Sequence, residues 1–170
     1  YDAAICHAAF SSSVKNLLDR LRLGKLAYIA TGVRQLILCR PAPLSITLDN
    51  GRTLRYRKTF FAAAMNCRFE GGGVRFCPSA LPDDGFLNLC IVEGPSRLLI
   101  LPLFLLSLAG IHGILPGVHL LRVRSAEFQC SRRLPVHTDG EPYFLKGKMQ
   151  IRCVPGILSI ISGPGKNSRN

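Results

Sequence analysis

Two short bends gather acidic side chains that could do chemistry in a chain with few acids. The stretch "PDDG" holds Asp83 and Asp84, and "TDGE" holds Asp139 and Glu141, which together make four of the ten acidic residues. A carboxylate can hold a magnesium ion or take a proton from a hydroxyl, and phosphoryl transfer uses both. Among so many arginines we expect these carboxylates to stay ionised. Asp-Gly is also an ordinary turn sequence, and each bend taken alone favours that simpler interpretation.

The other motifs give weaker indications of a site. Gly71 to Gly73 in "EGGGV" could offer backbone N–H groups to a phosphate, although glycine triplets are more often bulges or linkers. The phosphate-binding signature GxxxxGK[ST] and the nucleophile motif GxSxG are absent from the sequence. The histidines lack the spacing of a metal site, and we predict structural roles for all four: His7, His112, His119 and His137.

The composition indicates one globular domain with an anionic partner. A length of 170 residues suits a single domain with its own hydrophobic core, and 48% apolar with 19% charged residues is a globular composition. The net charge of +12 favours nucleic acid, an acidic membrane or a phosphorylated ligand. Because the arginines are scattered and not interleaved with aromatic residues, we predict that nucleic acid is not the partner.

The cysteines favour packing over metal binding. Their number is odd and no CxxC pair occurs, so a zinc-thiolate site is not expected. No secretory signal opens the sequence, and we expect a reducing cytosol in which the cysteines serve as small buried apolar residues. The seven are Cys6, Cys39, Cys67, Cys77, Cys90, Cys130 and Cys153.

The elements that must position the two bends are mainly strands. Residues 11–35 have helical spacing, and Asn50-Gly51 between two alternating runs predicts a β-hairpin. The apolar run from Leu98 to Gly110 is too short to span a bilayer, which takes about 20 residues. It predicts a buried core helix or, alternatively, a helix that touches a membrane at its interface. Strand patterns in "FLNLCIV", "VHLLRVRSAEFQCS", "LPVHTDGEPYFL" and "KMQIRCVPGILSIIS" predict a mainly β fold, a β-sandwich with two or three helices.

Taken in order, these stretches resemble a known family. "NCRFEGGGVRFCPSALPDDGFLNLCIV", followed later by "VHTDGEPYFLKGKMQIRCVPGILSII", is similar to the C-terminal domain of the bacterial diacylglycerol kinase and YegS-like lipid kinases, which are related to sphingosine and ceramide kinases. The resemblance covers nearly the whole chain. It implies a C-terminal β-sandwich domain over residues 1–163, with a first strand missing, and we expect residues 164–170 to form a disordered tail.

The resemblance also implies roles for particular residues. Kinases of this family transfer the γ-phosphate of ATP to a lipid hydroxyl with Mg²⁺. The family's magnesium site maps to Leu81, Asp84 and Phe86, with Leu81 and Phe86 acting through their backbone carbonyls. The family's catalytic base maps to Glu141, with Asp139 as its close rival.

The resemblance carries no ATP-contacting residue to this chain, because the GGDGT-type loop and the α/β nucleotide domain that precede this domain in the family are absent. We therefore expect either a fragment or a truncated gene product, inactive by itself. The implied partners are a lipid substrate and an anionic membrane surface at the cytosolic face, with a homodimer as a further option. The alternative is a non-catalytic lipid- or phosphate-binding module.

Overall fold

The structure is a computed structural model that describes residues 40–70, 73–94 and 97–159. The helix predicted over residues 11–35 and the tail predicted over residues 164–170 lie outside these ranges. The described elements follow one another in the order β1 (Ala42–Leu48), β2 (Thr53–Met65), β3 (Leu87–Glu93), α4 (Arg97–Ala109), the 3₁₀-helix η1 (His112–Ile114), β4 (Val118–Val123), β5 (Ser125–Thr138) and β6 (Glu141–Arg152).

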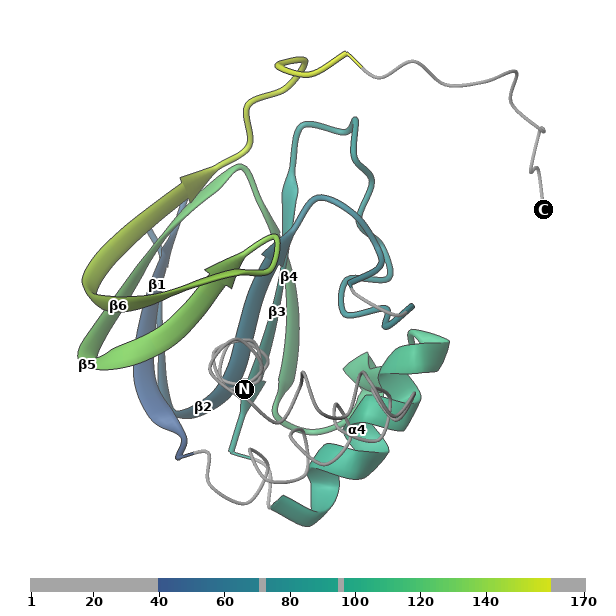
Figure 1. Cartoon of the computed structure of the whole chain (residues 1–170), viewed down its shortest axis with the longest axis vertical. Helices are drawn as coiled ribbons and strands as arrows, with labels where there is room; N and C mark the ends of the chain where they lie inside the picture. The colour runs from purple at the N-terminus through teal and green to yellow at the C-terminus, as the bar shows by residue number, and fades with distance from the viewer. Residues whose placement is uncertain (1–39, 71–72, 95–96, 160–170) are drawn as a thin grey trace, which may run out of the picture.

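The six strands form one antiparallel sheet with the order β4-β3-β2-β1-β5-β6, which confirms the mainly β class. The sheet is strongly curved, and Figure 1 shows β5 and β6 bending back toward the middle of the molecule. The pairing of β5 with β6 shifts register between Cys130 and Leu134, and such a bulge bends the strand that carries it. The curvature brings the β5–β6 hairpin near segments that are far away in the strand order.

Two hydrophobic clusters lie on the two faces of the sheet. Strand β3 contributes to both, because Leu89 and Ile91 point into one cluster and Cys90 and Val92 into the other. This alternation explains why its five central residues are all buried. The first cluster is built from β1 to β5, with partly buried residues of β6 packed against it, and its buried members are Leu44, Ile46, Tyr56, Leu89, Ile91, Val123, Ala126, Phe128 and Cys130.

The second cluster lies under α4 and the segment before β3. It contains Leu103 of the helix, Cys77 and Ala80 of the segment, and Phe60 of β2. The segment thereby packs against the sheet and carries the "PDDG" bend to the start of β3. The position of Asp84 thus depends on this second cluster rather than on the main core.

The hairpin predicted at Asn50-Gly51 is confirmed. Strands β1 and β2 are joined by a tight loop in which Gly51 has a φ of +78° and donates its N–H to the Leu48 carbonyl at 2.9 Å. The Leu48 N–H donates to the Arg52 carbonyl, also at 2.9 Å. A turn followed by a left-handed glycine is a common three-residue hairpin loop.

The apolar helix is confirmed as α4, but only one side of it is buried. Leu103 and Ser107 face the sheet, whereas Phe104, Leu105 and Leu108 are exposed. The prediction of a buried core helix is therefore correct for one face alone. The helix ends at Gly110, which has a φ of +77°, and the Ile111 N–H donates to the Leu106 carbonyl at 3.0 Å, as in the Schellman motif. No helix within the described ranges is long and apolar enough to cross a membrane.

Candidate functional site

The "TDGE" bend is the two-residue turn of the β5–β6 hairpin. Thr138 pairs with Glu141, so Asp139 and Gly140 form the loop. Both have positive φ, at 48° and 89°, which is the geometry of a type I′ turn. Asp tolerates the left-handed region better than most residues. The carboxylates of Asp139, at the tip, and of Glu141, the first residue of β6, are both exposed to solvent.

His137 connects this turn to another part of the chain. Its Nδ1 accepts a hydrogen bond from the Gly140 N–H at 3.4 Å, and its Nε2 lies 3.4 Å from Oε1 of Glu70. Accepting at Nδ1 leaves the proton on Nε2, where it faces the carboxylate. The side chains of His137 and Glu70 are only 18% and 24% exposed. The contact places the hairpin tip beside the segment that enters the glycine loop, so the predicted structural role of His137 fits its surroundings.

The "PDDG" bend is held by Asp84. Its Oδ1 accepts a hydrogen bond from the Phe86 N–H at 2.9 Å, an Asx-turn contact, and Gly85 between them has a φ of +75°. Its Oδ2 accepts a hydrogen bond from Nη2 of Arg122 at 2.9 Å. The Asp84 side chain is 12% exposed, whereas Asp83 points to solvent.

Arg122 also stacks on the aromatic residue of the same bend. Its guanidinium carbon lies 4.0 Å from the centre of the Phe86 ring, and that of Arg124 lies 5.1 Å from the same centre. Such stacking favours the flat guanidinium group. Leu81, the third residue of the predicted magnesium site, is 41% exposed at the start of the bend.

The oxygen donors of this bend suit magnesium in kind, since the cation prefers carboxylate and carbonyl oxygens and retains several waters. Within the described residues, no group of three or more His, Cys, Asp or Glu side chains could hold a metal ion. A cation at this bend would therefore depend on the Asp84 carboxylate and on the carbonyls of Leu81 and Phe86. The assignment of these three residues stays a prediction.

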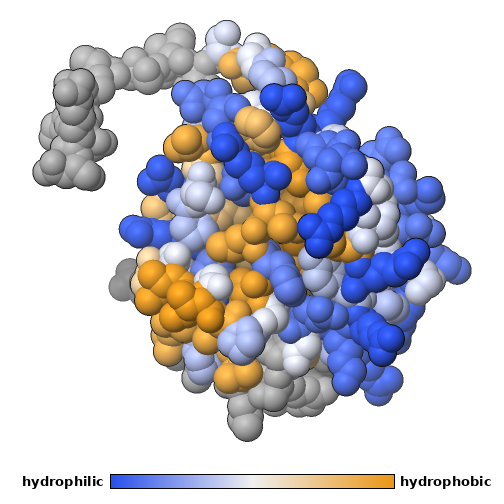
Figure 2. All heavy atoms as spheres, turned by 180° about the vertical axis from the view of Figure 1, so that it is seen from behind, coloured by the Kyte–Doolittle hydropathy of each residue, from blue (hydrophilic) through white to orange (hydrophobic). Residues whose placement is uncertain are grey.

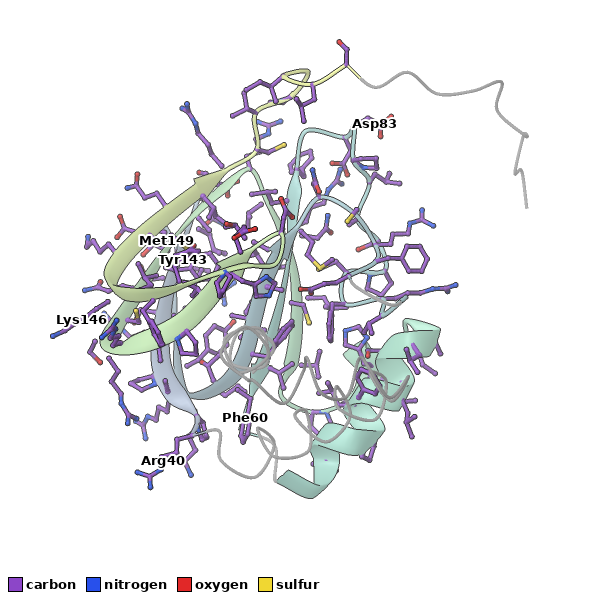
Figure 3. All side chains as sticks on the ribbon, in the orientation of Figure 1. Arg40, Phe60, Asp83, Tyr143, Lys146 and Met149 are labelled. Carbon is purple, nitrogen blue, oxygen red and sulfur yellow. The ribbon has the colours of Figure 1, made fainter. Side chains whose placement is uncertain are left out.

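The two bends have different partners. Asp84 contacts Arg122 on β4, and the Asp139-Gly140 turn contacts His137 and, through it, Glu70. Figure 3 shows Asp83 near the chain that leaves β6 and Tyr143 on the β5–β6 side. These contacts do not join one bend to the other.

Glu70 near one bend and Arg122 at the other are related indirectly, through the charge of Glu70 at Cys77 and through the pairing of β3 with β4. The charge of Glu70 helps to raise the pKa of the Cys77 thiol, after burial, which is the larger cause. The Cys77 thiol donates to the Asn88 carbonyl at 3.3 Å, and Asn88 is the cross-strand partner of Arg122. Asn88 and Arg122 therefore project from the same face of the sheet.

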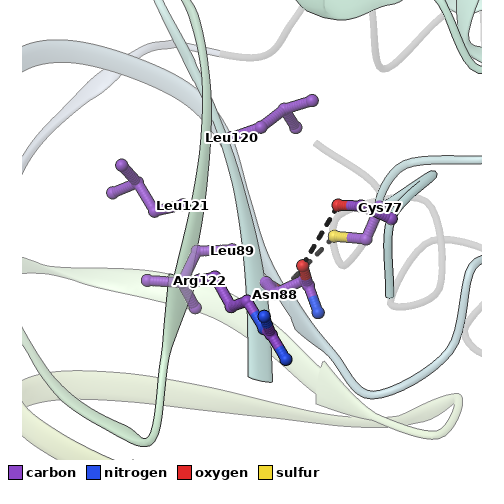
Figure 4. Close-up of a pocket in the computed structure, with 7 residues that line it drawn as sticks. Cys77, Asn88, Leu89, Leu120, Leu121 and Arg122 are labelled. Carbon is purple, nitrogen blue, oxygen red and sulfur yellow. Dashed lines mark hydrogen bonds between the residues drawn. The ribbon is translucent and has the colours of Figure 1, made fainter. Parts of the chain in front are cut away.

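A small pocket lies between these groups. Its volume is about 90 Å³, and Figure 4 shows the Asn88 amide and the Arg122 guanidinium on one side of it. Sites for drug-sized ligands have roughly 300–1,000 Å³, so this pocket is too small for acyl chains. The residues that line it are Cys77, Ser79, Asn88, Leu89, Leu120, Leu121 and Arg122.

Sequence reasoning missed two residues of this region. Glu70 stood in the "EGGGV" motif without a role, and Arg122 was one of many scattered arginines. The signal for Glu70 was its position directly before the glycines. For Arg122 there was no local signal, because its pairing with Asp84 joins residues that are 38 positions apart.

Comparison with known proteins identifies the domain. A family model described as the YegS C-terminal NAD kinase beta sandwich-like domain matches residues 4–162. A diacylglycerol kinase of Mycobacterium tuberculosis is 28% identical over 159 residues, which cover 92% of this chain and 50% of that protein. A "Probable lipid kinase YegS-like" of Xanthomonas euvesicatoria is 34% identical over 138 residues, which cover 80% of this chain and 43% of that protein.

A solved structure shares the fold. The crystal structure of a diacylglycerol kinase from Bacillus anthracis aligns with a TM-score of 0.61 at 21% identity, covering 82% of this chain and 46% of that one. The chain thus spans about half the length of the curated relatives it matches. On the evidence of the matched residues, the chain belongs to the family of the YegS C-terminal β-sandwich-like domain.

Proposed function

We propose that this chain is the C-terminal domain of a lipid kinase that transfers the γ-phosphate of ATP to a lipid hydroxyl of the diacylglycerol type. Family membership supports the reaction class, because relatives matched over most of this chain are named diacylglycerol kinase and lipid kinase. The structural observation that carries the proposal is the type I′ turn, which presents the Asp139 and Glu141 carboxylates to solvent at the tip of the β5–β6 hairpin.

In this proposal Glu141, or Asp139 beside it, takes the proton from the lipid hydroxyl as the oxygen attacks the phosphate. A base must reach the hydroxyl within hydrogen-bond distance, and two exposed carboxylates at a hairpin tip are accessible to a substrate. The contact of His137 with the Gly140 N–H limits the freedom of the turn. Magnesium, when bound, would neutralise charge on the phosphates, and Leu81, Asp84 and Phe86 are the proposed residues for holding it.

Labelled ATP, Mg²⁺ and diacylglycerol in mixed micelles provide the test. The protein encoded by the complete reading frame that contains this chain should produce labelled lipid. The 170-residue chain alone should not, because it matches only the C-terminal half of its relatives. Clear turnover by the chain alone would contradict the assignment of ATP binding to another domain. No turnover by the complete protein on any hydroxylated lipid would refute the kinase function.

The second candidate is a non-catalytic lipid- or phosphate-binding module. It is favoured by the net charge of +12 and by the exposed apolar side chains of α4, which can bind a lipid surface without a nucleotide domain. In that case vesicles or phosphate should bind the complete protein, and no labelled lipid should form.

We also propose that the domain works at an anionic membrane surface on the cytosolic side. Apolar side chains gather over α4 and the residues after it, at the side of the molecule where Figure 2 shows a hydrophobic patch. Binding at a membrane interface combines electrostatic attraction to anionic lipids with burial of apolar side chains, and a positively charged protein with an exposed apolar helix face offers both. The exposed apolar residues are Leu99, Phe104, Leu105, Leu108, Ile111 and Ile114.

Flotation with phosphatidylcholine vesicles, with and without phosphatidylglycerol, tests this surface. The double variant Leu105→Glu, Leu108→Glu should bind the vesicles at least about tenfold more weakly than the wild type, since each leucine contributes roughly 1.5–3 kcal/mol when fully buried. Leu158→Glu is the matched control, an exposed leucine outside the patch, and should bind like the wild type. Equal binding of all three proteins would show that α4 does not touch the bilayer.

A further inference from the structure

The Asp84 carboxylate already has a cation beside it. Nη2 of Arg122 lies 2.9 Å from Oδ2, and the Phe86 N–H lies 2.9 Å from Oδ1, so each oxygen accepts one hydrogen bond. The carboxylate is 12% exposed, and its charge is therefore balanced mainly by the guanidinium rather than by water. Charge-assisted contacts of this length are among the stronger hydrogen bonds in proteins.

Arg122 is held in place by more than this ion pair. Its guanidinium packs 4.0 Å from the centre of the Phe86 ring. Its backbone is fixed in β4, where it is the register partner of Asn88 on the buried strand β3. The positive charge therefore stays near the bend because of the sheet and the ring, and not only because Asp84 attracts it.

A divalent cation would meet this charge at the same carboxylate. Mg²⁺ sits about 2.0–2.1 Å from its oxygen ligands, and a cation bound to Oδ2 would lie only a few ångströms from the guanidinium. Two positive charges at such a separation repel each other appreciably even with solvent nearby. Metal and arginine can share the carboxylate weakly, or one can displace the other.

We propose that Arg122 is a built-in counter-ion of Asp84, which holds the "PDDG" bend in shape without metal and competes with a divalent cation for the carboxylate. The proposal rests on the proposed function only in the choice of Asp84 as the metal ligand. It makes Arg122 the residue that sets how tightly the bend binds a metal, while the backbone N–H of Phe86 keeps Oδ1 oriented in either state.

Titration with Mn²⁺, with the free ion followed by electron paramagnetic resonance, measures the competition in the 170-residue chain. Arg122→Gln should bind Mn²⁺ about tenfold more tightly than the wild type, because one positive charge is removed. Arg122→Lys, which keeps the charge, should bind like the wild type. Arg124→Gln is the matched control, because Arg124 approaches the same ring at 5.1 Å and no side-chain contact joins it to Asp84 in the described structure.

Two further measurements make the result decisive. The gain of Arg122→Gln should vanish in the double variant Arg122→Gln, Asp84→Asn. In chelator-treated buffer Arg122→Gln should melt at a lower temperature than the wild type, and Mn²⁺ should abolish this difference, whereas the melting temperature of the wild type should be insensitive to the chelator. Equal Mn²⁺ affinity of the wild type and Arg122→Gln, or a gain that persists without Asp84, overturns the proposal. None of these readouts requires phosphoryl transfer, so failure of the kinase assay leaves them unchanged.

Discussion

Two glycines with nearly the same backbone conformation should respond very differently to alanine. Gly117 has a φ of +82° and Gly140 a φ of +89°. A Cβ at Gly140 would meet no atom within 4 Å, whereas a Cβ at Gly117 would lie 2.2 Å from the Glu93 carbonyl oxygen. The same two residues are joined by a hydrogen bond of 2.7 Å from the Glu93 N–H to the Gly117 carbonyl.

The expected magnitudes follow from these contacts. Gly140→Ala carries only the strain of a left-handed alanine, roughly 1–2 kcal/mol. Gly117→Ala carries the same strain and must also displace backbone, which adds roughly 1–3 kcal/mol as overpacking does. The two variants should therefore lose about 1–2 and about 2–5 kcal/mol of unfolding free energy.

Urea unfolding of the 170-residue chain measures the difference. The midpoint should fall further for Gly117→Ala than for Gly140→Ala, with the dependence on urea concentration unchanged in both. Equal losses would show that β3 and the start of β4 do not approach as closely as described. Because β4 carries Arg122, that result would also weaken the geometry of the Asp84 bend.

Two further predictions concern buried groups. Burial raises the pKa of the Cys77 thiol to about 12. At pH 8 Ellman's reagent should therefore label the exposed Cys67 rapidly and Cys77 only on unfolding. The variant Cys67→Ser should lose one rapidly labelled thiol, and fast labelling of Cys77 would contradict its burial. Burial also lowers the pKa of His112, against the weaker opposing effect of the Phe76 backbone. The unfolded state therefore binds the proton more readily, and stability should fall as the pH drops below about 6.5. Urea midpoints measured from about pH 7 down to about pH 5 should fall less in His112→Gln than in the wild type. The same pH dependence of the midpoint in both proteins would assign the effect to other groups.

Elements with strong local signals could be predicted from the sequence. Asn50-Gly51 lies where the hairpin turns, because few residues adopt a left-handed conformation as readily as glycine. Strand β3 and helix α4 follow their apolar patterns closely. In each case the information lies within a few neighbouring residues.

Strand lengths and pairings were harder to predict. The run "FFAAAMNC" is apolar enough to suggest a buried strand of its own, but most of it is the end of β2, which continues through a register shift between Thr59 and Phe61. The stretch "VHLLRVRSAEFQCS" is divided between β4 and β5, which pair with different strands. These features depend on the curvature of the whole sheet, which no short pattern encodes.

The contacts of the candidate site also depend on the fold of the whole sheet rather than on a local pattern. The residues of the two acidic bends were identified by type and by family resemblance. Their partners Glu70 and Arg122 become neighbours only through long-range pairing of strands. The sequence could therefore indicate which carboxylates to propose for the site, but not that one of them is already paired with an arginine.

The most direct test of the account is the turnover of the complete protein with substitutions in the β5–β6 turn. Glu141→Gln, Asp139→Asn and the control Glu127→Gln, an acid on β5 that pairs with Lys148, should be compared with labelled ATP and diacylglycerol. If the turn carries the base, Glu141→Gln or Asp139→Asn should lower kcat by about 10²- to 10⁴-fold with the KM for lipid little changed, and Glu127→Gln should match the wild type. Wild-type turnover in both turn variants would show that the bend is only a turn, and would contradict the proposed function of the hairpin.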